Sequence, residues 1–506
     1  MNSPGFQPGG KKKPEAPRPH DKNKKSEGLL SDGMNGMKKR NKNRMLKFTD
    51  IKQVYFLGIG GIGMSALARY FASQGIAVSG YDRTATELTA ALETEGIAVH
   101  YNDDPAMLPV NLNLADSLIV YTPAVPATHK ELKTLISRGF EIHKRAEVLG
   151  IICNSKRTIA VAGTHGKTSV STITAHILKS STKGCAAFMG GISKNYKTNL
   201  LLDDTGSEWI VAEADEFDRS FLHLKPELAV ITSMDADHLD IYGTHEKVIE
   251  SFKLFAGNIK EGGALVHKKG LPLGTDPSSK YKAYSYSITE TADFCAVNIE
   301  LKDGYYQFDL KIPERTIEKL VLNYPGLLNV ENAVAASALS LLAGVSAEEI
   351  RGAMATYAGV KRRFDIHLKN ENFVLIDDYA HHPEELRATI QSVRDIYKDR
   401  TLTGVFQPHL YSRTNDFADG FAKSLDLLDE IVLLDIYPAR ELPMEGVTSD
   451  LIFKQLKNTN KRLCAKAELV KLAATFKPGI IIMMGAGDID TLVEPVKGQL
   501  LKYEDR

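Results

Sequence analysis

A short glycine-rich segment, Gly163 to Thr168 (GTHGKT), places the strongest constraint on what this chain can fold into. An apolar run, Thr158 to Ala162, precedes it, and a helix-like stretch, Ser169 to Lys179, follows it. A strand, a glycine-rich loop and a helix in this order form a phosphate cradle, because free backbone N–H groups and the positive helix end face the anion. Lys167 can neutralise phosphate charge, and the Thr168 hydroxyl can hold Mg²⁺. The pattern predicts a nucleoside triphosphate site.

The basic charge of the chain is concentrated at its beginning. Formal net charge is zero over 506 residues, but thirteen Lys or Arg fall within residues 1–47. This segment has almost no large apolar residue, so a disordered tail is expected there. A basic tail can bind nucleic acid or an anionic membrane, but a solvated extension is favoured, and neither partner is expected. The remainder, 43% apolar and 25% charged over the whole chain, is typical of globular domains, about three at this length.

Several classes of protein are disfavoured by what the sequence lacks. No run approaches the roughly eighteen consecutive apolar residues that a membrane-spanning helix needs. The four cysteines, Cys153, Cys185, Cys295 and Cys464, lie far apart without C-x-x-C spacing, which argues against a zinc site or a disulfide framework. A reducing cytoplasm is therefore the expected location.

Residues 48–152 are predicted to form a Rossmann-like N-terminal domain. A strand, Gln53 to Leu57, runs into Gly58 to Gly63 (GIGGIG), and a second strand, Ala77 to Gly80, ends next to Asp82. Glycines after a first strand, with an acidic residue about twenty positions on that can accept hydrogen bonds from a ribose, are the pattern of a dinucleotide fold. Alone, this pattern would suggest NAD.

Two further α/β units follow. Residues 153–359 are predicted to be a central P-loop ATPase-type α/β domain, with a β-rich patch near residues 294–322. Residues 360–506 are predicted to be a C-terminal Rossmann-like α/β domain. Its buried-strand patterns lie at residues 373–376, 403–406, 430–434 and 479–484. The expected fold class is therefore α/β, in three domains.

Acidic residues follow two strands of the central domain. The strand near residues 209–212 ends in Glu213-Ala214-Asp215-Glu216, and the strand near residues 229–233 runs into Asp235-Ala236-Asp237-His238. Acids at the carboxyl ends of strands beside a phosphate loop can ligate Mg²⁺. Glu213 is the first candidate, whereas for His238 metal ligation and a structural role remain equally open.

Two loops of the last domain are dense in His, Tyr and Arg. Asp377 to Pro383 (DDYAHHP) and Gln407 to Arg413 (QPHLYSR) each follow a buried strand. Loops at one sheet edge converge, and Arg recognises carboxylates through two parallel hydrogen bonds, so one shared site is predicted. The alternative is that Pro383 merely begins a helix after a polar loop.

Ten motifs, in order and spacing, resemble those of the Mur ligases over about residues 52–502. They are GIGGIGMSALA, HKRAEVL, AGTHGKTS, EADEFDRSF, DADHLDIYG, LLNVENAVAA, KRRF, DDYAHHPEE, QPHLYSRT and GAGDI. The resemblance implies an ATP-dependent ligase of bacterial peptidoglycan synthesis, with ATP and Mg²⁺ as cofactors and a monomer or homodimer as its state. ATP would phosphorylate the lactyl carboxylate of UDP-N-acetylmuramate, and the amine of L-alanine would attack the resulting acyl phosphate.

The resemblance also implies roles for single residues. The sugar nucleotide is expected near Gly58, Gly60, Gly61, Gly63, Asp82, Thr122 and Ala124. ATP is expected near Gly163, Thr164, His165, Gly166, Lys167, Thr168, Ser169, Asn329, Asn332, Arg363 and Asp378. The implied magnesium positions are Thr168, Glu213 and His238, and the implied alanine site is Tyr379, His381 and Arg413. The expected catalytic residues are Lys167, Glu213, His238, Arg363 and His381.

Three positions depart from the family pattern. Leu328 stands where many relatives have His, and Leu410 stands where relatives often have Arg, which leaves Arg413 as the more secure partner of the alanine carboxylate. Some Mur ligases use a carboxylated lysine, but Lys253 is expected to be a surface lysine on an amphipathic helix.

Three other functions remain as alternatives. A recycling ligase that joins a tripeptide to the same sugar nucleotide would share most motifs but would need a larger acceptor site. An NAD-dependent dehydrogenase would explain the first domain and leave the phosphate loop unexplained. A non-catalytic nucleic-acid-binding protein would rest on the basic tail alone.

Overall fold

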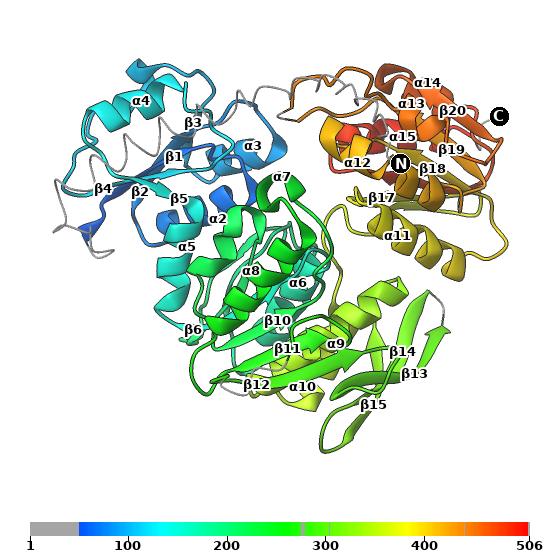
Figure 1. Cartoon of the computed structure of the whole chain (residues 1–506), viewed down its shortest axis with the longest axis horizontal. Coiled ribbons are helices and arrows are strands. Elements are labelled where there is room, and N and C mark those ends of the chain that lie inside the picture. Colours follow the sequence, from blue (N-terminus) through cyan, green and yellow to red (C-terminus); the bar gives the residue numbers. More distant parts are fainter. Residues whose placement is uncertain (1–49, 275–278, 303, 440, 504–506) are drawn as a thin grey trace, which may run out of the picture.

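The computed structural model describes residues 50–274, 279–302, 304–439 and 441–503. The predicted disordered tail, residues 1–47, lies outside the described residues. Within them, strands form three separate sheets, each accompanied by helices (Figure 1). The predicted three-domain α/β fold is confirmed, while the exact boundaries proposed at residues 152 and 359 stay predictions.

The N-terminal sheet is fully parallel, in the order β3-β2-β1-β4-β5. Its strands are β1 (Gln53–Leu57), β2 (Ala77–Tyr81), β3 (Ala98–His100), β4 (Ser117–Tyr121) and β5 (Ile142–Lys144). Its helices are α2 (Ile62–Ser73), α3 (Glu87–Thr94), α4 (Lys130–Ser137) and α5 (Arg145–Asn154). The predicted strand Gln53–Leu57 is the central strand, and the glycine loop leads from it directly into α2.

The central sheet has ten strands in the order β15-β14-β13-β12-β11-β10-β6-β9-β7-β8. They are β6 (Arg157–Ala162), β7 (Ala186–Phe188), β8 (Leu200–Leu201), β9 (Trp209–Glu213), β10 (Leu228–Ile231), β11 (Ala264–Lys268), β12 (Lys282–Ser287), β13 (Phe294–Lys302), β14 (Tyr305–Lys311) and β15 (Thr316–Leu322). The helices are α6 (Lys167–Lys179), α7 (Leu239–Tyr242), α8 (His245–Gly257), α9 (Leu327–Leu342) and α10 (Ala347–Thr356). The predicted β-rich patch is the antiparallel part, β13 to β15.

The C-terminal sheet runs in the order β16-β17-β21-β18-β19-β20, and β16 is its antiparallel edge. Its strands are β16 (Asp365–Lys369), β17 (Phe373–Asp378), β18 (Leu402–Phe406), β19 (Glu430–Leu434), β20 (Lys461–Cys464) and β21 (Gly479–Met484). Its helices are α11 (Pro383–Ile396), α12 (Tyr411–Leu425), α13 (Asp450–Phe453), α14 (Leu469–Ala473) and α15 (Val493–Leu501). Every residue of β17, β18 and β21 is buried, because helices cover both faces of a parallel sheet.

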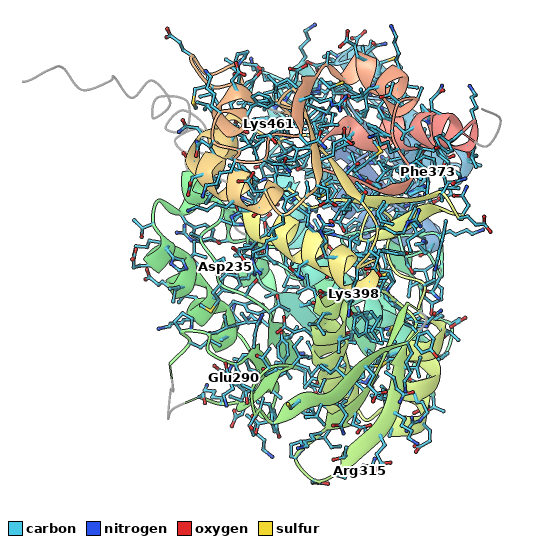
Figure 2. The ribbon with its side chains drawn as sticks, turned by 90° about the vertical axis from the view of Figure 1, so that its right-hand side faces the viewer. Asp235, Glu290, Arg315, Phe373, Lys398 and Lys461 are labelled. Atoms are coloured by element: carbon cyan, nitrogen blue, oxygen red, sulfur yellow. The ribbon has the colours of Figure 1, made fainter. Side chains whose placement is uncertain are left out.

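The arrangement of the three units fixes where a shared site can form. Strands β6, β9 and β10 lie side by side in the middle of the central sheet, so the loops after them meet at one edge. Asp235, in the loop after β10, lies on the C-terminal unit's side of the central unit (Figure 2). The β-rich patch, with Arg315 between β14 and β15, lies at the opposite end of the molecule (Figure 2).

Among the described residues, no helix is both long and apolar enough to cross a membrane. All four cysteines are buried and free of disulfide bonds.

Candidate active site

The phosphate loop between β6 and α6 depends on glycine at two positions. Gly163 has φ 140° and Gly166 has φ 82°, in the region of backbone space that favours glycine. A Cβ atom at Gly163 would also overlap Thr232 Oγ1. Because Gly166 stands at the N-cap of α6 without a capping side chain, the first-turn N–H groups remain available to an anion.

Lys167 is held by the acids that follow β9. Its ammonium donates to the Gly163 carbonyl at 2.7 Å and lies 2.7 Å from Glu216 Oε2, on a side chain that is 1% exposed. Burial lowers the pKa of Lys167, but the carboxylates of Glu216, Asp215 and Glu213 outweigh burial and keep that pKa above its usual value. The protein's own acids thus surround the one cation of the loop.

The three predicted magnesium positions gather beside this lysine. Glu213 has a buried Oε2 atom without a hydrogen-bond partner among the described residues. Burial raises the pKa of Glu213, while the nearby Lys167 ammonium and the hydrogen-bonding Thr168 hydroxyl lower it. His238 Nε2 lies 3.9 Å from Glu216 Oε1, and burial lowers the pKa of His238, so its ring is neutral and able to ligate a metal.

These donors do not by themselves form a complete metal site. In the described part of the chain, no three His, Cys, Asp or Glu side chains are grouped so as to hold a metal ion. Mg²⁺ commonly takes one or two protein ligands and completes its shell with substrate phosphates and water. The orphaned Glu213 oxygen beside Thr168 fits that partial donor set.

One cavity lies between the phosphate loop, α9 and the C-terminal unit. Its lining is His165, Gly166, Thr168, Ser169, Leu328, Asn329, Asn332, Arg363, Phe364, Asp378, Glu385, Ala388, Thr389 and Ser392. It therefore brings together most residues predicted to contact ATP, whereas Gly163, Thr164 and Lys167 lie outside this lining. Asn329 donates to the Pro325 carbonyl at 2.6 Å, and Leu328, 41% exposed, adds an apolar surface to the cavity.

A second cavity lies between the N-terminal and central units. It is lined by Gly61, Ile62, Gly63, Met64, Ala66, Thr122, Pro123, Ala124, Lys144, Arg145, Ala146, Leu149, Phe188, Met189, Gly190, Glu213, Asp215, Phe217 and Ser220. Gly58, Gly60 and Asp82 are not among these residues. Instead, Asp82 Oδ2 accepts a 2.7 Å hydrogen bond from the Gly60 N–H and so fixes the glycine loop.

Two cations of the second cavity escaped the sequence-based search. Lys144 Nζ lies 2.7 Å from Asp218 Oδ2, and Arg145 Nη2 lies 3.2 Å from Asp215 Oδ2. Lys144 is the last residue of β5 and Arg145 the first of α5, at the carboxyl edge of the N-terminal sheet. Both belong to the HKRAEVL motif, and the basic residues of this motif could have identified them from the sequence. They give this cavity positive charge suited to a diphosphate.

The two cavities approach each other at Thr168 and Glu213. Thr168 lines the first cavity and Glu213 lines the second, and the Thr168 hydroxyl is close enough to the Glu213 carboxyl to lower its pKa. Gly190 lies against Glu213 so closely that a Cβ atom there would overlap the carboxylate. The phosphate end of one cavity thus lies next to the other cavity.

The predicted alanine-site residues come from two loops of the C-terminal unit. The Tyr379 ring lies under two guanidinium groups, with Arg362 and Arg363 centred 5.0 and 5.2 Å from its centroid. His381 Nδ1 is 2.9 Å from the Tyr379 carbonyl oxygen. Burial lowers the pKa of His381 to about 4, and the Arg413 cation acts in the same direction. His381 is therefore a neutral hydrogen-bonding group.

Arg413 reaches across to the central unit. Its Nη2 donates to Asp237 Oδ1 at 3.2 Å, and both side chains are about nine-tenths buried. Burial raises the pKa of Asp237, but the neighbouring His238 and Arg413 reverse the effect and hold that pKa well below its usual value. This ion pair joins the loop after β10 to the first turn of α12.

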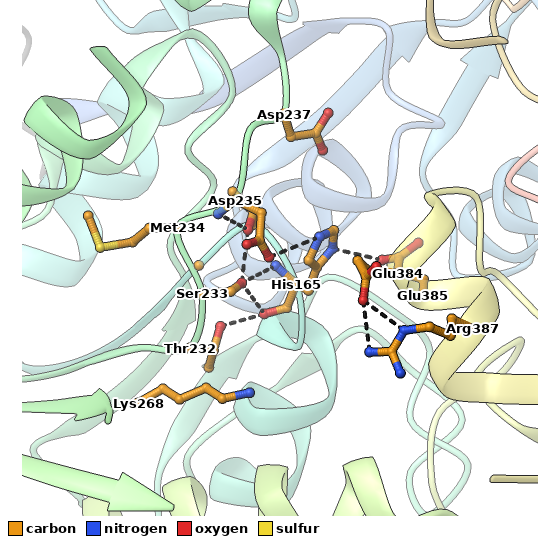
Figure 3. Close-up of polar contacts among 12 residues, drawn as sticks. His165, Thr232, Ser233, Met234, Asp235, Asp237, Lys268, Glu384, Glu385 and Arg387 are labelled. Carbon is orange, nitrogen blue, oxygen red and sulfur yellow. Dashed lines mark hydrogen bonds and ion pairs between the residues drawn. The ribbon is translucent and has the colours of Figure 1, made fainter. Parts of the chain in front are cut away.

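Glu385 is a third site residue, after Lys144 and Arg145, that the sequence analysis did not identify. Its Oε1 lies 3.3 Å from His165 Nδ1 and 3.9 Å from Arg363 Nη1, and its Oε2 accepts a 3.0 Å hydrogen bond from the His381 N–H. Figure 3 shows Glu385 turned toward His165, while the neighbouring Glu384 turns away to Arg387. The sequence feature that could have identified it is its position four residues after His381, on the inner face of an amphipathic helix.

Comparison with known families shows to which family the chain belongs. Family models match three consecutive segments: the catalytic domain of the Mur ligase family over residues 53–157, the Mur ligase middle domain over residues 161–340, and the Mur ligase glutamate ligase domain over residues 362–487. The chain belongs to the Mur ligase family.

Individual Mur ligases resemble the chain over nearly their whole length. The UDP-N-acetylmuramate--L-alanine ligase of Parabacteroides distasonis is 53% identical over 453 residues, which cover 89% of this chain and 98% of that protein. The enzyme of the same name from Porphyromonas gingivalis is also 53% identical, with 89% and 99% covered. The crystal structure of the UDP-N-acetylmuramate-alanine ligase MurC from Thermotoga maritima superposes with a TM-score of 0.75 at 26% identity, covering 90% of this chain and 99% of that one.

Two positions that depart from the Mur ligase pattern have clear surroundings. Leu410 is buried at the N-cap of α12 with φ 71°, a conformation uncommon for leucine, and its N–H donates to the Tyr437 carbonyl at 2.9 Å. Lys253 lies exposed on α8, away from the buried face that carries Phe252 and Phe255.

Glu385→Gln should destabilise this Mur ligase. Removing one charge of a buried cluster leaves its partners uncompensated, at a cost of about 3 kcal/mol. We expect a lower urea midpoint, followed by circular dichroism, and weaker ATP binding. The control is Glu384→Gln, which removes an exposed ion pair worth at most about 0.5 kcal/mol. Equal midpoints for the two variants would contradict the role given to Glu385.

His381 should make stability depend on pH. Its pKa falls from about 6.5 in an unfolded chain to about 4 in the fold. The unfolded state therefore binds more protons between these values, and stability is lost as pH falls from about 6.5 to about 4. His381→Asn should flatten this slope by up to about 1.4 kcal/mol per pH unit. Urea titrations at pH 7, 6, 5 and 4.5 measure it, and parallel curves for variant and wild type would refute it.

Proposed function

We propose that this chain is an ATP-dependent amide ligase that joins L-alanine to the lactyl carboxylate of UDP-N-acetylmuramate through an acyl phosphate, in peptidoglycan precursor synthesis. The observation that carries the proposal is the similarity, at 53% identity over nearly the whole relative, to proteins named for this reaction. The geometry agrees, because a phosphate-loop cavity meets a second cavity at Thr168 and Glu213.

The two cavities suit two anionic substrates. UDP-N-acetylmuramate would lie in the second cavity, with its diphosphate near Lys144 and Arg145 and its lactyl carboxylate toward Glu213. ATP would lie in the first cavity, with its adenine near Asn329 and Asn332 and its terminal phosphate at Lys167 and Arg363. Two anions must approach during phosphoryl transfer, so concentrated positive charge is the main catalytic requirement.

The reaction balances without a nucleophilic side chain. A carboxylate oxygen of the sugar nucleotide bonds to the γ-phosphorus as the bond to ADP breaks. The alanine nitrogen then bonds to the acyl carbon as the bond to phosphate breaks. The alanine ammonium gives up two protons overall, one of which remains on the released phosphate while the other leaves to solvent. The residues of this chain position the reactants and exclude water from the acyl phosphate.

Magnesium belongs to the same proposal. Thr168, Glu213 and His238 would hold it, which is supported by the unpaired Glu213 oxygen and the neutral His238 ring. When bound, Mg²⁺ would neutralise charge that develops on the transferring phosphoryl group. A cytoplasmic location and a monomeric or homodimeric state stay predictions.

The alternatives are not favoured. A murein peptide ligase from Psychrobacter arcticus superposes with a TM-score of 0.65, but at 22% identity this similarity shows the fold alone. An NAD-dependent dehydrogenase leaves the central and C-terminal family matches unexplained.

Phosphate release by the purified full chain tests the function. With ATP, Mg²⁺ and UDP-N-acetylmuramate, we expect release on adding L-alanine and little on adding L-alanyl-γ-D-glutamyl-diaminopimelate. Lys167→Ala, which removes the loop cation, should lower the rate by about 100-fold or more. Release with the tripeptide alone would identify a recycling ligase instead.

His238→Ala should raise the magnesium concentration needed for half-maximal rate, by about tenfold. The reason is the loss of one neutral nitrogen donor beside Glu216. His223→Ala, at an exposed position after β9, is the matched control and should leave the titration unchanged. Superimposable magnesium curves for His238→Ala and wild type would remove His238 from the metal site.

A further inference from the structure

The ion pair between Arg413 and Asp237 occupies the region where the acceptor amino acid is expected. Arg413 Nη2 donates to Asp237 Oδ1 at 3.2 Å, and that oxygen also accepts a 2.8 Å hydrogen bond from the His238 N–H. Within the described residues, this is the one hydrogen bond of the Arg413 guanidinium, which has five N–H donors. A buried guanidinium with so few partners retains donors for a ligand.

Stability alone does not explain why this ion pair is buried. Burying two charges costs desolvation free energy that their attraction barely offsets, and apolar residues of similar size commonly stabilise as much. Arg413 lies on α12 of the C-terminal unit, whereas Asp237 lies after β10 of the central unit. The pair therefore forms only when the two units are close together.

The charges of this pair match those of an amino acid. A free α-amino acid carries a carboxylate and an ammonium on one α-carbon. The carboxylate is the natural partner of a guanidinium, and the ammonium is the natural partner of a carboxylate. Arg413 therefore gives Asp237 the positive charge that the ammonium of an amino acid would give it. Asp237 gives Arg413 the negative charge that the carboxylate of the amino acid would give it.

We propose that Asp237 binds the ammonium of the acceptor amino acid, and that its pairing with Arg413 is replaced when the amino acid enters between them. This inference rests on the proposed function. It makes Asp237 a specificity residue, because a zwitterion with both charges on one carbon satisfies both partners. A tripeptide, whose first carboxyl is an amide, can satisfy Asp237 but leaves Arg413 without a counter-charge.

The charges of the ligand distinguish binding of the ammonium by Asp237 from a pair that only holds the central and C-terminal units together. If the pair only held the two units together, Asp237→Asn would weaken every acceptor-site ligand alike. If Asp237 binds the ammonium, the substitution weakens ligands that carry an ammonium. It leaves Arg413 free, so a carboxylate without an ammonium binds as well as before or better.

Steady-state kinetics of the full-length Asp237→Asn variant separate these cases. Phosphate release is measured at saturating ATP, Mg²⁺ and UDP-N-acetylmuramate, with L-alanine as substrate and propionate as competitive inhibitor. We expect the KM for L-alanine to rise about tenfold or more, with the inhibition constant of propionate unchanged or lower. Arg413→Gln should instead abolish inhibition by propionate. The control, Asp419→Asn on the exposed face of α12, pairs with Lys423 and should change neither constant.

Three results would overturn the inference: an unchanged KM for L-alanine, an equal rise in both constants, or a parallel shift of the magnesium titration, which would mean that Asp237 acts through His238. Absence of phosphate release by the wild type with L-alanine would refute the proposed function instead. Calorimetric titration of the same variants with L-alanine and propionate, in the presence of both nucleotides, would then still decide the role of Asp237.

Discussion

The carboxylate of Glu385 is the contact on which the arrangement of the site depends. It meets His165 of the phosphate loop, Arg363 of the segment that leads into β16, and His381 of the loop after β17. Burial raises the pKa of Glu385, but His381, His165 and Arg363 reverse the effect and hold that pKa well below its usual value. One ionised side chain of the C-terminal unit is therefore tied to the helix end that would receive the nucleotide phosphates.

The charges around the phosphate loop are paired, in part because the C-terminal unit lies close to the loop. Lys167, His165 and Arg363 each lie beside a carboxylate, namely Glu216 or Glu385. Burial raises the pKa of Glu216 to about 7, even though the Lys167 ammonium opposes this. A phosphate that takes Lys167 from Glu216 would leave a carboxyl group able to accept a proton near neutral pH. The carboxylates of Glu216 and Glu385 thus hold the three cations in place. Glu216 can then lose its negative charge by protonation once a phosphate has replaced it beside Lys167.

Much of the fold could be predicted from the sequence, and the omissions have physical reasons. β1, β19 and β21 were predicted at their observed bounds, because buried parallel strands read as continuous apolar runs. β7, β8, β16 and β20 are short or lie at sheet edges, where apolar runs are weak. At the site, motifs marked the phosphate loop and the strand-end acids. The partners across units did not follow from them, since Glu385 resembles Glu384 in sequence and helix phase alone separates them.

The remaining contacts show how one interface can serve both closure and substrate binding. His165 with Glu385, and Arg413 with Asp237, each join the central unit to the C-terminal unit through buried charges. Separating the units would hydrate these charges, whereas bringing them together strips water from all of them at once. Apolar contacts could close the same gap, but they would give substrates nothing to replace. Charged contacts keep the interface closed while remaining exchangeable for ligands of matching charge. His165 and Asp237 lie on loops after parallel strands, and Glu385 and Arg413 lie in the first turns of α11 and α12. A phosphate or an amino acid can take a partner there without disturbing the sheets beneath.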